Sequence, residues 1–240
     1  MDLPQRVSWR DERGLMYGTM QDGAVDYLIT LSYRRRPSFP SPTESLWSTE
    51  VSGLAVPQTI TWRELRKSAL VEPIAVAWHA VDISPFKQGD SVLILGGGPI
   101  GLAVLQVLKV RGAEKVIVSE VSPRRKQFAA EFGADYVLDP TKEDVVARVR
   151  ELCDGQGAHV AFDAAGVQAG LNAAILAIRA RGTLCNIAVW EKPASINVND
   201  LVFKERYYMG TACYVFGDFQ AVIDAIETGK CSLRCTTTVC

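Results

Sequence analysis

The sequence lacks an excess of charge of either sign. Lys and Arg together number 26, Asp and Glu number 27, and the formal net charge of the 240 residues is −1. Binding to a nucleic acid or to an anionic membrane surface requires a basic excess on some face of the protein. A disordered chain is excluded as well, because hydrophobic residues make up 48% of the sequence. We therefore expect a globular protein with neither a nucleic-acid nor a membrane partner.

Cysteine and histidine are absent from long parts of the chain. No Cys precedes Cys153 and no His precedes His79. The six cysteines also lack the paired spacing of a disulfide framework. The first residues carry charge throughout, without the apolar run of a secretory signal. These absences favour a protein of the reducing cytoplasm.

Long hydrophobic runs are also missing, apart from one uncharged run at residues 91–108. Its length, about 18 residues, approaches that of a membrane-spanning helix. Three consecutive glycines and Pro99 interrupt its middle, however, which suits a turn between a strand and a helix. The run therefore predicts two elements of a soluble domain.

Both ends of the chain read as irregular. Residues 1–56 include a basic, Pro- and Ser-rich stretch at 34–42, and short apolar pieces at 27–29 and 53–56 that could be strands. Residues 231–240 place three cysteines in a C-x3-C-x4-C spacing, which matches no metal motif without His or carboxylate partners. We expect a poorly defined segment over 1–56 and an irregular tail over 231–240.

Between residues 57 and 230, apolar strands alternate with helices. Thr61 and Glu64 form a capping-box pattern for a short first helix. The predicted strands are residues 91–95, 115–120, 136–138, 159–162, 183–187 and 207–214. The predicted helices are residues 72–81, 99–111, 123–132, 142–152, 169–179 and 217–228. This alternation predicts an α/β fold with a doubly wound parallel six-stranded Rossmann sheet of order 3-2-1-4-5-6.

The strongest motif is a glycine loop between the first strand and the next helix. Gly96, Gly98 and Gly101 satisfy G-x-G-x-x-G. Gly96 suits the tight turn, Gly98 allows a pyrophosphate to approach closely, and Gly101 allows the helix to pack on the strand. Pro99 fits the first helical turn, where its missing N–H costs nothing. The freed N–H groups of that helix would then face the phosphates of a dinucleotide.

Glu120 supplies the acidic residue that accompanies such a loop. It ends the second strand, 19 residues after Gly101. A carboxylate there accepts hydrogen bonds from the adenosine ribose and repels a 2′-phosphate, which favours NAD over NADP. Arg124 and Arg125 follow and could tolerate a phosphate, stack on adenine, or simply mark a solvated helix start.

With these motifs assembled, the sequence resembles the zinc-type medium-chain alcohol and polyol dehydrogenases, most closely the 2,3-butanediol and sorbitol dehydrogenase branch. The resemblance rests on four segments in the right order: residues 69–81 (ALVEPIAVAWHAV), 96–101 (GGGPIG), 162–166 (FDAAG) and 201–205 (LVFKE). It covers residues 57–230 and implies hydride transfer between NAD(H) and a small secondary alcohol, diol or polyol, or its ketone.

The resemblance implies roles for individual cofactor-site residues. Ile100 would lie beside the pyrophosphate, and Arg125 would pack along the adenosine. The remaining positions are expected near the nicotinamide, with sheet core as their alternative role. These positions are Ala164, Gly166, Ile187, Ala188 and Val189.

The resemblance also implies a catalytic domain ahead of the cofactor domain, with zinc held by a Cys and a Gly-His-Glu motif. Residues 1–56 contain neither Cys nor His, so we expect them to be only a remnant of that domain, without its metal site. Glu72 matches the glutamate that approaches zinc in the polyol enzymes, and is expected to be a relic or a helix N-terminal carboxylate. His79 is expected to be a core histidine, and His159 shows no evident partner in the sequence.

Several interpretations stay open at this point. The chain could be an active oxidoreductase, an NAD(H)-binding module without catalysis, a truncated reading frame, or a zinc-free quinone-reductase relative. The last fits less well, because Glu72 and Glu120 belong to the zinc-type, NAD-preferring branches. The resemblance further implies a homo-oligomer that pairs through the sheet edge near residues 207–214.

Overall fold

The computed structural model describes residues 7–10, 16–20 and 70–228, and the chain divides into two compact units, Met1–Trp62 and Arg63–Cys240. In the first unit, β1 (Val7–Arg10) pairs antiparallel with β2 (Met16–Met20). The sequence patterns did not predict this pair. The strands expected at 27–29 and 53–56, the first helix near Thr61, the domain limits at 56 and 230, and the tail at 231–240 lie outside the described residues.

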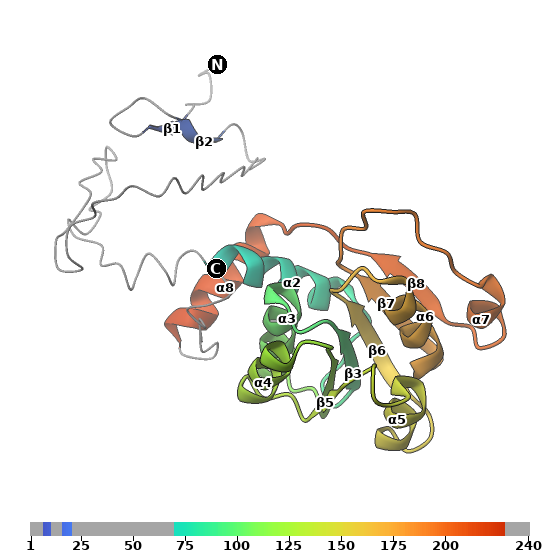
Figure 1. The fold of residues 1–240 in the computed structure, drawn as a ribbon. Coiled ribbons are helices and arrows are strands. Elements are labelled where there is room, and N and C mark those ends of the chain that lie inside the picture. Colours follow the sequence, from blue (N-terminus) through green and yellow to red (C-terminus); the bar gives the residue numbers. More distant parts are fainter. Residues whose placement is uncertain (1–6, 11–15, 21–69, 229–240) are drawn as a thin grey trace. The chain divides into compact units, whose positions relative to one another are not determined.

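The second unit contains a parallel six-stranded sheet of order β5-β4-β3-β6-β7-β8 (Figure 1). The strand order confirms the predicted 3-2-1-4-5-6 arrangement. The sheet reverses its direction of growth between β3 and β6, which opens a crevice at the carboxyl ends of these strands. The strands are β3 (Ser91–Leu95), β4 (Lys115–Ser119), β5 (Tyr136–Leu138), β6 (Ala158–Asp163), β7 (Ile178–Asn186) and β8 (Tyr207–Gly210).

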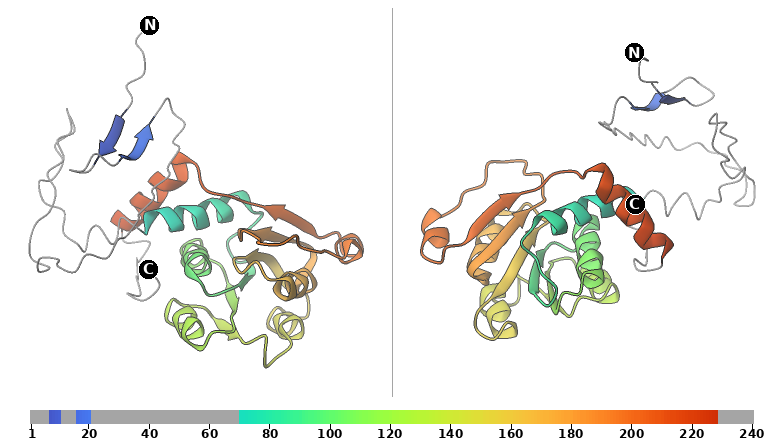
Figure 2. Two further views of the ribbon diagram at one scale, coloured as in Figure 1. Left: turned by 45° about the horizontal axis from the view of Figure 1, so that its top comes forward. Right: turned by 180° about the vertical axis from the view of Figure 1, so that it is seen from behind.

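Helices cover both faces of the sheet, as Figures 1 and 2 show. Side chains alternate between faces along a strand, so Val92 and Ile94 enter one core while Leu93 and Leu95 enter the other. The first core also contains side chains of α2, α3, α4 and α8, and the second those of α5 and α6. The helices are α2 (Val71–Ile83), α3 (Pro99–Val110), α4 (Pro123–Glu131), α5 (Val145–Leu152), α6 (Gln168–Ala177), α7 (Val198–Val202) and α8 (Phe216–Glu227).

Local chemistry decides where several elements begin and end. The helix predicted from residue 142 begins at Val145, because the Asp144 side chain caps it by accepting from the N–H groups of Val146 and Ala147. The strand predicted from residue 183 begins at Ile178, directly after α6 ends. The strand predicted over 207–214 ends at Gly210. The prediction was too long there, because Cys213 has a φ of 55°, which no strand accommodates.

The uncharged run at residues 91–108 consists of β3, the glycine turn and most of α3. Among the described residues, no helix is both long and apolar enough to cross a membrane. The run is therefore the buried centre of the sheet and the helix that follows it.

Candidate functional site

The glycine loop joins β3 to α3, and each glycine meets a different surrounding. Gly96 has a φ of 90°, a conformation that L side chains rarely adopt. A Cβ on Gly101 would lie 1.9 Å from the carbonyl oxygen of Gly96, so this position tolerates no side chain. A Cβ on Gly98 would meet no atom within 4 Å. The loop is therefore closed by packing at Gly101 and open to an incoming group at Gly98.

The N-terminus of α3 faces the same opening. Gly98 is its N-cap and Pro99 occupies the first turn. The first backbone bond into the helix runs from the N–H of Leu102 to the carbonyl of Gly98, at 2.9 Å. The N–H groups of Ile100 and Gly101 precede it and lie among the groups that a helix cannot satisfy internally. Such a helix start is suited to an anion, because its N–H groups and its dipole both favour negative charge.

Glu120 lies beside this loop, directly after β4, and is only 4% exposed. Its Oε2 accepts from the Gly97 N–H at 2.7 Å, and its Oε1 accepts from the Ser122 N–H at 2.8 Å. Nη1 of Arg125 lies 4.0 Å from Oε2. Each carboxylate oxygen has further acceptor capacity. The two backbone bonds thus fix the carboxylate and leave it able to accept from a ligand hydroxyl.

A cleft of about 630 Å³ lies at the carboxyl ends of the central strands. Its size falls within the range of small-molecule and cofactor sites. It contains the predicted residues Gly96, Gly98, Glu120, Arg125 and Ala164 in one place. The lining residues are Leu95, Gly96, Gly98, Ser119, Glu120, Val121, Arg125, Pro140, Thr141, Glu143, Asp144, Val145, Val146, Ala164, Ala165, Val167, Ala169, Gly170 and Ala173.

The other predicted site residues lie outside this lining. Ile100 and Ile187 are half-buried against the first core, and Pro99 is exposed. Gly166 adjoins the end of β7, since a Cβ on it would lie 3.2 Å from that of Ala188 and 3.5 Å from the carbonyl oxygen of Val189. Apart from Pro99, Ile100 and Gly101 at the start of α3, the predicted site residues thus lie in two groups, one in the cleft and one where the loop after β6 meets the loop after β7.

Asp163 holds the loop after β6 in place. This fully buried residue ends β6, and its Oδ1 accepts from the N–H groups of Ala165 and Gly166 at 2.9 and 3.0 Å. Its own carbonyl accepts from the N–H groups of Ile187 and Ala188. One residue thus connects the loops that follow β6 and β7.

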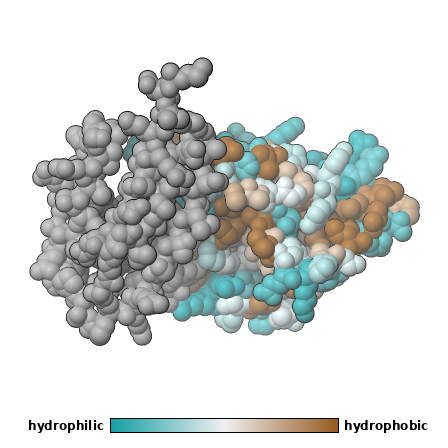
Figure 3. Space-filling model, turned by 90° about the horizontal axis from the view of Figure 1, so that it is seen from above, coloured by the Kyte–Doolittle hydropathy of each residue, from teal (hydrophilic) through white to brown (hydrophobic). Residues whose placement is uncertain are grey.

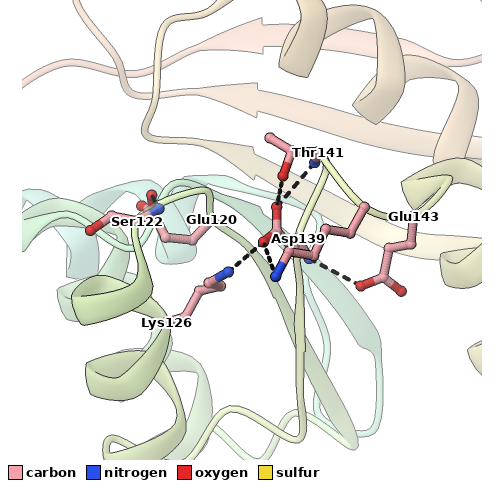
Figure 4. Close-up of polar contacts among 7 residues, drawn as sticks. Glu120, Ser122, Lys126, Asp139, Thr141 and Glu143 are labelled. Carbon is pink, nitrogen blue, oxygen red and sulfur yellow. Dashed lines mark hydrogen bonds and ion pairs between the residues drawn. The ribbon is translucent and has the colours of Figure 1, made fainter.

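Asp139 pairs with several neighbouring side chains, and the sequence analysis did not identify it (Figure 4). It follows β5 and is 7% exposed. Oδ1 accepts from the backbone N–H and the hydroxyl of Thr141, and Oδ2 accepts from Nζ of Lys126 at 2.5 Å. The lysine and the Thr141 hydroxyl together hold the pKa of Asp139 well below its ordinary value. Its position after a parallel strand was the signal that could have identified it.

The histidines are paired with acidic or backbone groups. Nδ1 of His79 lies 2.8 Å from Oδ2 of Asp218, which connects α2 to α8. The expectation that His159 has no evident partner was wrong. Its Nδ1 accepts from the Ser91 N–H at 3.1 Å, and its Nε2 lies 3.7 Å from Oδ1 of Asp90. Sequence reasoning missed this partner because residues 91 and 159 are adjacent only across the β3–β6 pair.

The described residues do not assemble a zinc site. No group of three or more His, Cys, Asp or Glu side chains among them could hold a metal ion. Glu72 lies exposed in the first turn of α2. A catalytic zinc needs three protein ligands. The part of the chain that the structure describes therefore fits a dinucleotide but not a zinc ion.

Comparison with known proteins decides the family. Residues 99–228 match the family model described as zinc-binding dehydrogenase. The chain belongs to the zinc-binding dehydrogenase family. This confirms the resemblance inferred from the glycine loop and the neighbouring motifs.

Relatives of the chain include the (R,R)-butanediol dehydrogenase of Neisseria gonorrhoeae, 41% identical over 71% of this chain and 48% of the relative. The crystal structure of 2R,3R-butanediol dehydrogenase from Bacillus subtilis is similar at 43% identity, with a TM-score of 0.64, over 67% of this chain and 46% of that one. A Sinorhizobium meliloti protein described as a zinc-binding dehydrogenase, solved with NADP, is 31% identical with a TM-score of 0.64, over 69% and 49% of the two chains. The chain thus spans about half the length of these relatives.

Proposed function

We propose that this chain binds NAD(H) in the cleft at the carboxyl ends of β3, β4 and β6. The observation that carries the proposal is the opening at Gly98, directly beside the helix start and the fixed carboxylate of Glu120. The pyrophosphate would lie against Gly96, Gly98 and the N-terminus of α3. The adenosine ribose would donate to Glu120, with Arg125 alongside.

The nicotinamide end would extend toward the second group of residues. Ala164 and Gly166 would pass near its ribose. The backbone of Ile187, Ala188 and Val189 would bind its carboxamide. Bound NAD supplies the hydride acceptor of an alcohol oxidation. These residues orient its ring, and Asp163 supports them by tying their loops together.

The reaction proposed for this chain, as a member of the family, is hydride transfer between NAD(H) and a small secondary alcohol or diol, or its ketone. The similarity to butanediol dehydrogenases supports this substrate class. The described residues supply the cofactor half of such an enzyme. No step through zinc follows from them, because the described residues include no set of ligands that would hold a zinc ion to polarise the alcohol.

A second candidate function is an NAD(H)-binding module that has no alcohol dehydrogenase activity of its own. The exposed position of Glu72, away from any metal-type cluster of the described residues, favours it. One experiment separates the two. The purified chain is titrated with NADH by fluorescence, then assayed with NAD, added zinc and a panel of small diols and polyols.

Each outcome of this experiment has a definite meaning. Saturable NADH binding without turnover supports the NAD(H)-binding module. Zinc-dependent NADH production supports the alcohol dehydrogenase. Failure to bind NADH contradicts the proposal itself. A metal analysis of the purified protein accompanies the assay, since about one zinc per chain would contradict the module.

The edge strand β8 is proposed to pair with a second copy of the chain. Tyr207 is 60% exposed and Phe203 79% exposed, and Figure 3 shows apolar side chains gathered over α7 next to this edge. An exposed edge strand next to apolar surface favours association. Size measurement by light scattering tests this, with Tyr207→Lys expected to give monomers. A wild-type monomer would contradict it.

The cytoplasm remains the proposed location. The described cysteines Cys153, Cys185 and Cys213 are free thiols, as expected in a reducing compartment.

A further inference from the structure

NAD and NADP differ by one phosphate on the adenosine ribose, so the charges around that ribose decide which of them binds. Four charged residues line the cleft in the described part of the chain: Glu120, Arg125, Glu143 and Asp144. Three of them are acidic. A 2′-phosphate entering beside Glu120 would meet one lining cation, Arg125, which already lies 4.0 Å from the Glu120 carboxylate.

Lys126 is the cation best placed to change this balance. It is adjacent to Arg125 on α4, and its N–H donates to the carbonyl of Ser122, whose own N–H holds Glu120. Its side chain is 21% exposed, yet it does not line the cleft. Instead it extends to Asp139, as Figure 4 shows. The lysine is therefore next to a residue of the cleft lining, but its charge is paired with Asp139 and it does not line the cleft itself.

Asp139 is built to hold the lysine in that position. The two bonds from Thr141 to Oδ1 fix the plane of the carboxylate and direct Oδ2 toward Lys126, at 2.5 Å. The backbone carbonyl of Asp139 accepts from the N–H groups of Lys142 and Glu143, which closes the turn. Nζ of Lys142 lies farther from Oδ2, at 3.8 Å, and its side chain is 76% exposed.

Asp139 and Glu120 are also neighbours in the sheet. They follow β5 and β4, and the Glu120 N–H donates to the carbonyl of Leu138 at 3.0 Å. Neighbouring strands lie about 4.8 Å apart, so a flexible lysine released from one carboxylate remains within reach of the ribose beside the other.

We propose that Asp139 is a specificity-determining residue for the cofactor: by retaining Lys126 in an ion pair, it withholds a cation from the adenosine end of the cleft and so disfavours a 2′-phosphate. The proposal rests on the proposed binding of NAD(H) in this cleft. Glu120 acts by direct repulsion, whereas Asp139 acts by keeping a neighbouring positive charge occupied.

Asp139→Asn tests the proposal. The Asn side-chain oxygen still accepts from Thr141, whereas its NH2 group cannot accept from Lys126. The released lysine can then bind a 2′-phosphate through a charge-assisted hydrogen bond. We expect the ratio of the Kd for NADPH to the Kd for NADH to fall about tenfold, because such bonds contribute on the order of 1.5–3 kcal/mol. Both values are measured by fluorescence titration of the full chain at low ionic strength.

Two further variants assign the effect to Lys126. In Asp139→Asn combined with Lys126→Met, the ratio should return to the wild-type value. Lys126→Met alone leaves Asp139 without its nearest cation, so the ratio should rise severalfold. This second variant also serves if Asp139→Asn does not fold.

A second Asp–Lys ion pair, outside the cleft, provides a matched control. Asp135 binds Nζ of Lys109 at 2.7–2.8 Å, and neither residue lines the cleft. Asp135→Asn removes the carboxylate charge and so weakens the pair with Lys109 outside the cleft, and it should leave the ratio unchanged.

The outcomes distinguish this inference from the proposed function. If wild type binds neither cofactor, the proposed function fails. If wild type binds NADH but Asp139→Asn leaves the ratio of the two Kd values unchanged, for example by weakening the binding of both cofactors equally, Asp139 has only a structural role and the inference is overturned. A wild type that prefers NADPH would overturn it as well.

Discussion

Gly98 and Gly101 belong to one motif, and the structure predicts opposite consequences for the same substitution at the two positions. Nothing lies within 4 Å of a Cβ built on Gly98, whose φ of −74° and ψ of −176° suit alanine. The folded chain should therefore tolerate Gly98→Ala within about 0.5 kcal/mol. The new methyl would occupy the space in front of the α3 N-terminus, where the pyrophosphate is proposed to approach the backbone.

Gly101→Ala should act on the fold instead. Its Cβ would lie 1.9 Å from the Gly96 carbonyl oxygen, and only a backbone shift of more than an ångström relieves that contact. Overpacking of this kind costs about 3 kcal/mol. In a domain of this size that lowers the Tm by about 6–12 °C.

The assay combines thermal unfolding without ligand and NADH titration of both variants. Gly98→Ala should keep the wild-type Tm and raise the Kd for NADH at least about hundredfold, because one or two charge-assisted hydrogen bonds to the phosphates are lost. Gly101→Ala should lower the Tm. Normal NADH binding by a well-folded Gly98→Ala would refute the placement of the pyrophosphate at this loop.

Three further predictions concern side chains elsewhere in the second unit. The pKa of Asp139 is lowered from 3.8, mainly by Lys126, so its stabilisation is present at neutral pH and is lost as pH falls below about 3.8. In urea unfolding, the free energy of unfolding of Asp139→Asn should therefore be clearly lower than that of wild type at pH 7, and the difference should shrink at pH 3. A difference that grows at pH 3 would contradict this sign. Burial raises the pKa of Cys185 to about 12. Mass spectrometry after iodoacetamide treatment should thus find exposed Cys213 labelled and Cys185 unlabelled until the chain unfolds. His79→Ala should lower the free energy of unfolding by about 1–2 kcal/mol, because Asp218 loses its partner on α2, and an unchanged urea midpoint would rule that link out.

The alternation of apolar strands and helices was enough to predict the sheet and its order. Each inner strand carries consecutive apolar residues, as a strand buried on both faces requires. Its neighbours are joined by helices of ordinary length, and handedness rules leave few topologies for such a chain. The strands at 91–95 and 136–138 appear with the predicted limits.

The glycine loop was predictable for the same reason, because its chemistry is local. Gly96, Gly98 and Gly101 lie within six residues, and Glu120 directly follows the next strand, so parallel pairing of β3 with β4 brings it back to the loop. The helix predicted from residue 142 begins three residues later in the structure, at Val145. The reason is that the carbonyl of Asp139 closes a turn over residues 141–143 before Asp144 caps α5.

The sequence by itself determined the elements, their order and the position of the glycine loop, because these depend on residues a few positions apart. Only the tertiary structure decided which charged side chains meet. Lys126 and Asp139 are 13 positions apart, Ser91 and His159 are 68 apart, and His79 and Asp218 are 139 apart. A hydrogen bond forms only within about 3 Å, and no sequence period brings such atoms together. Sheet register and helix packing position them, and so the charge around the cleft depends on the folded chain.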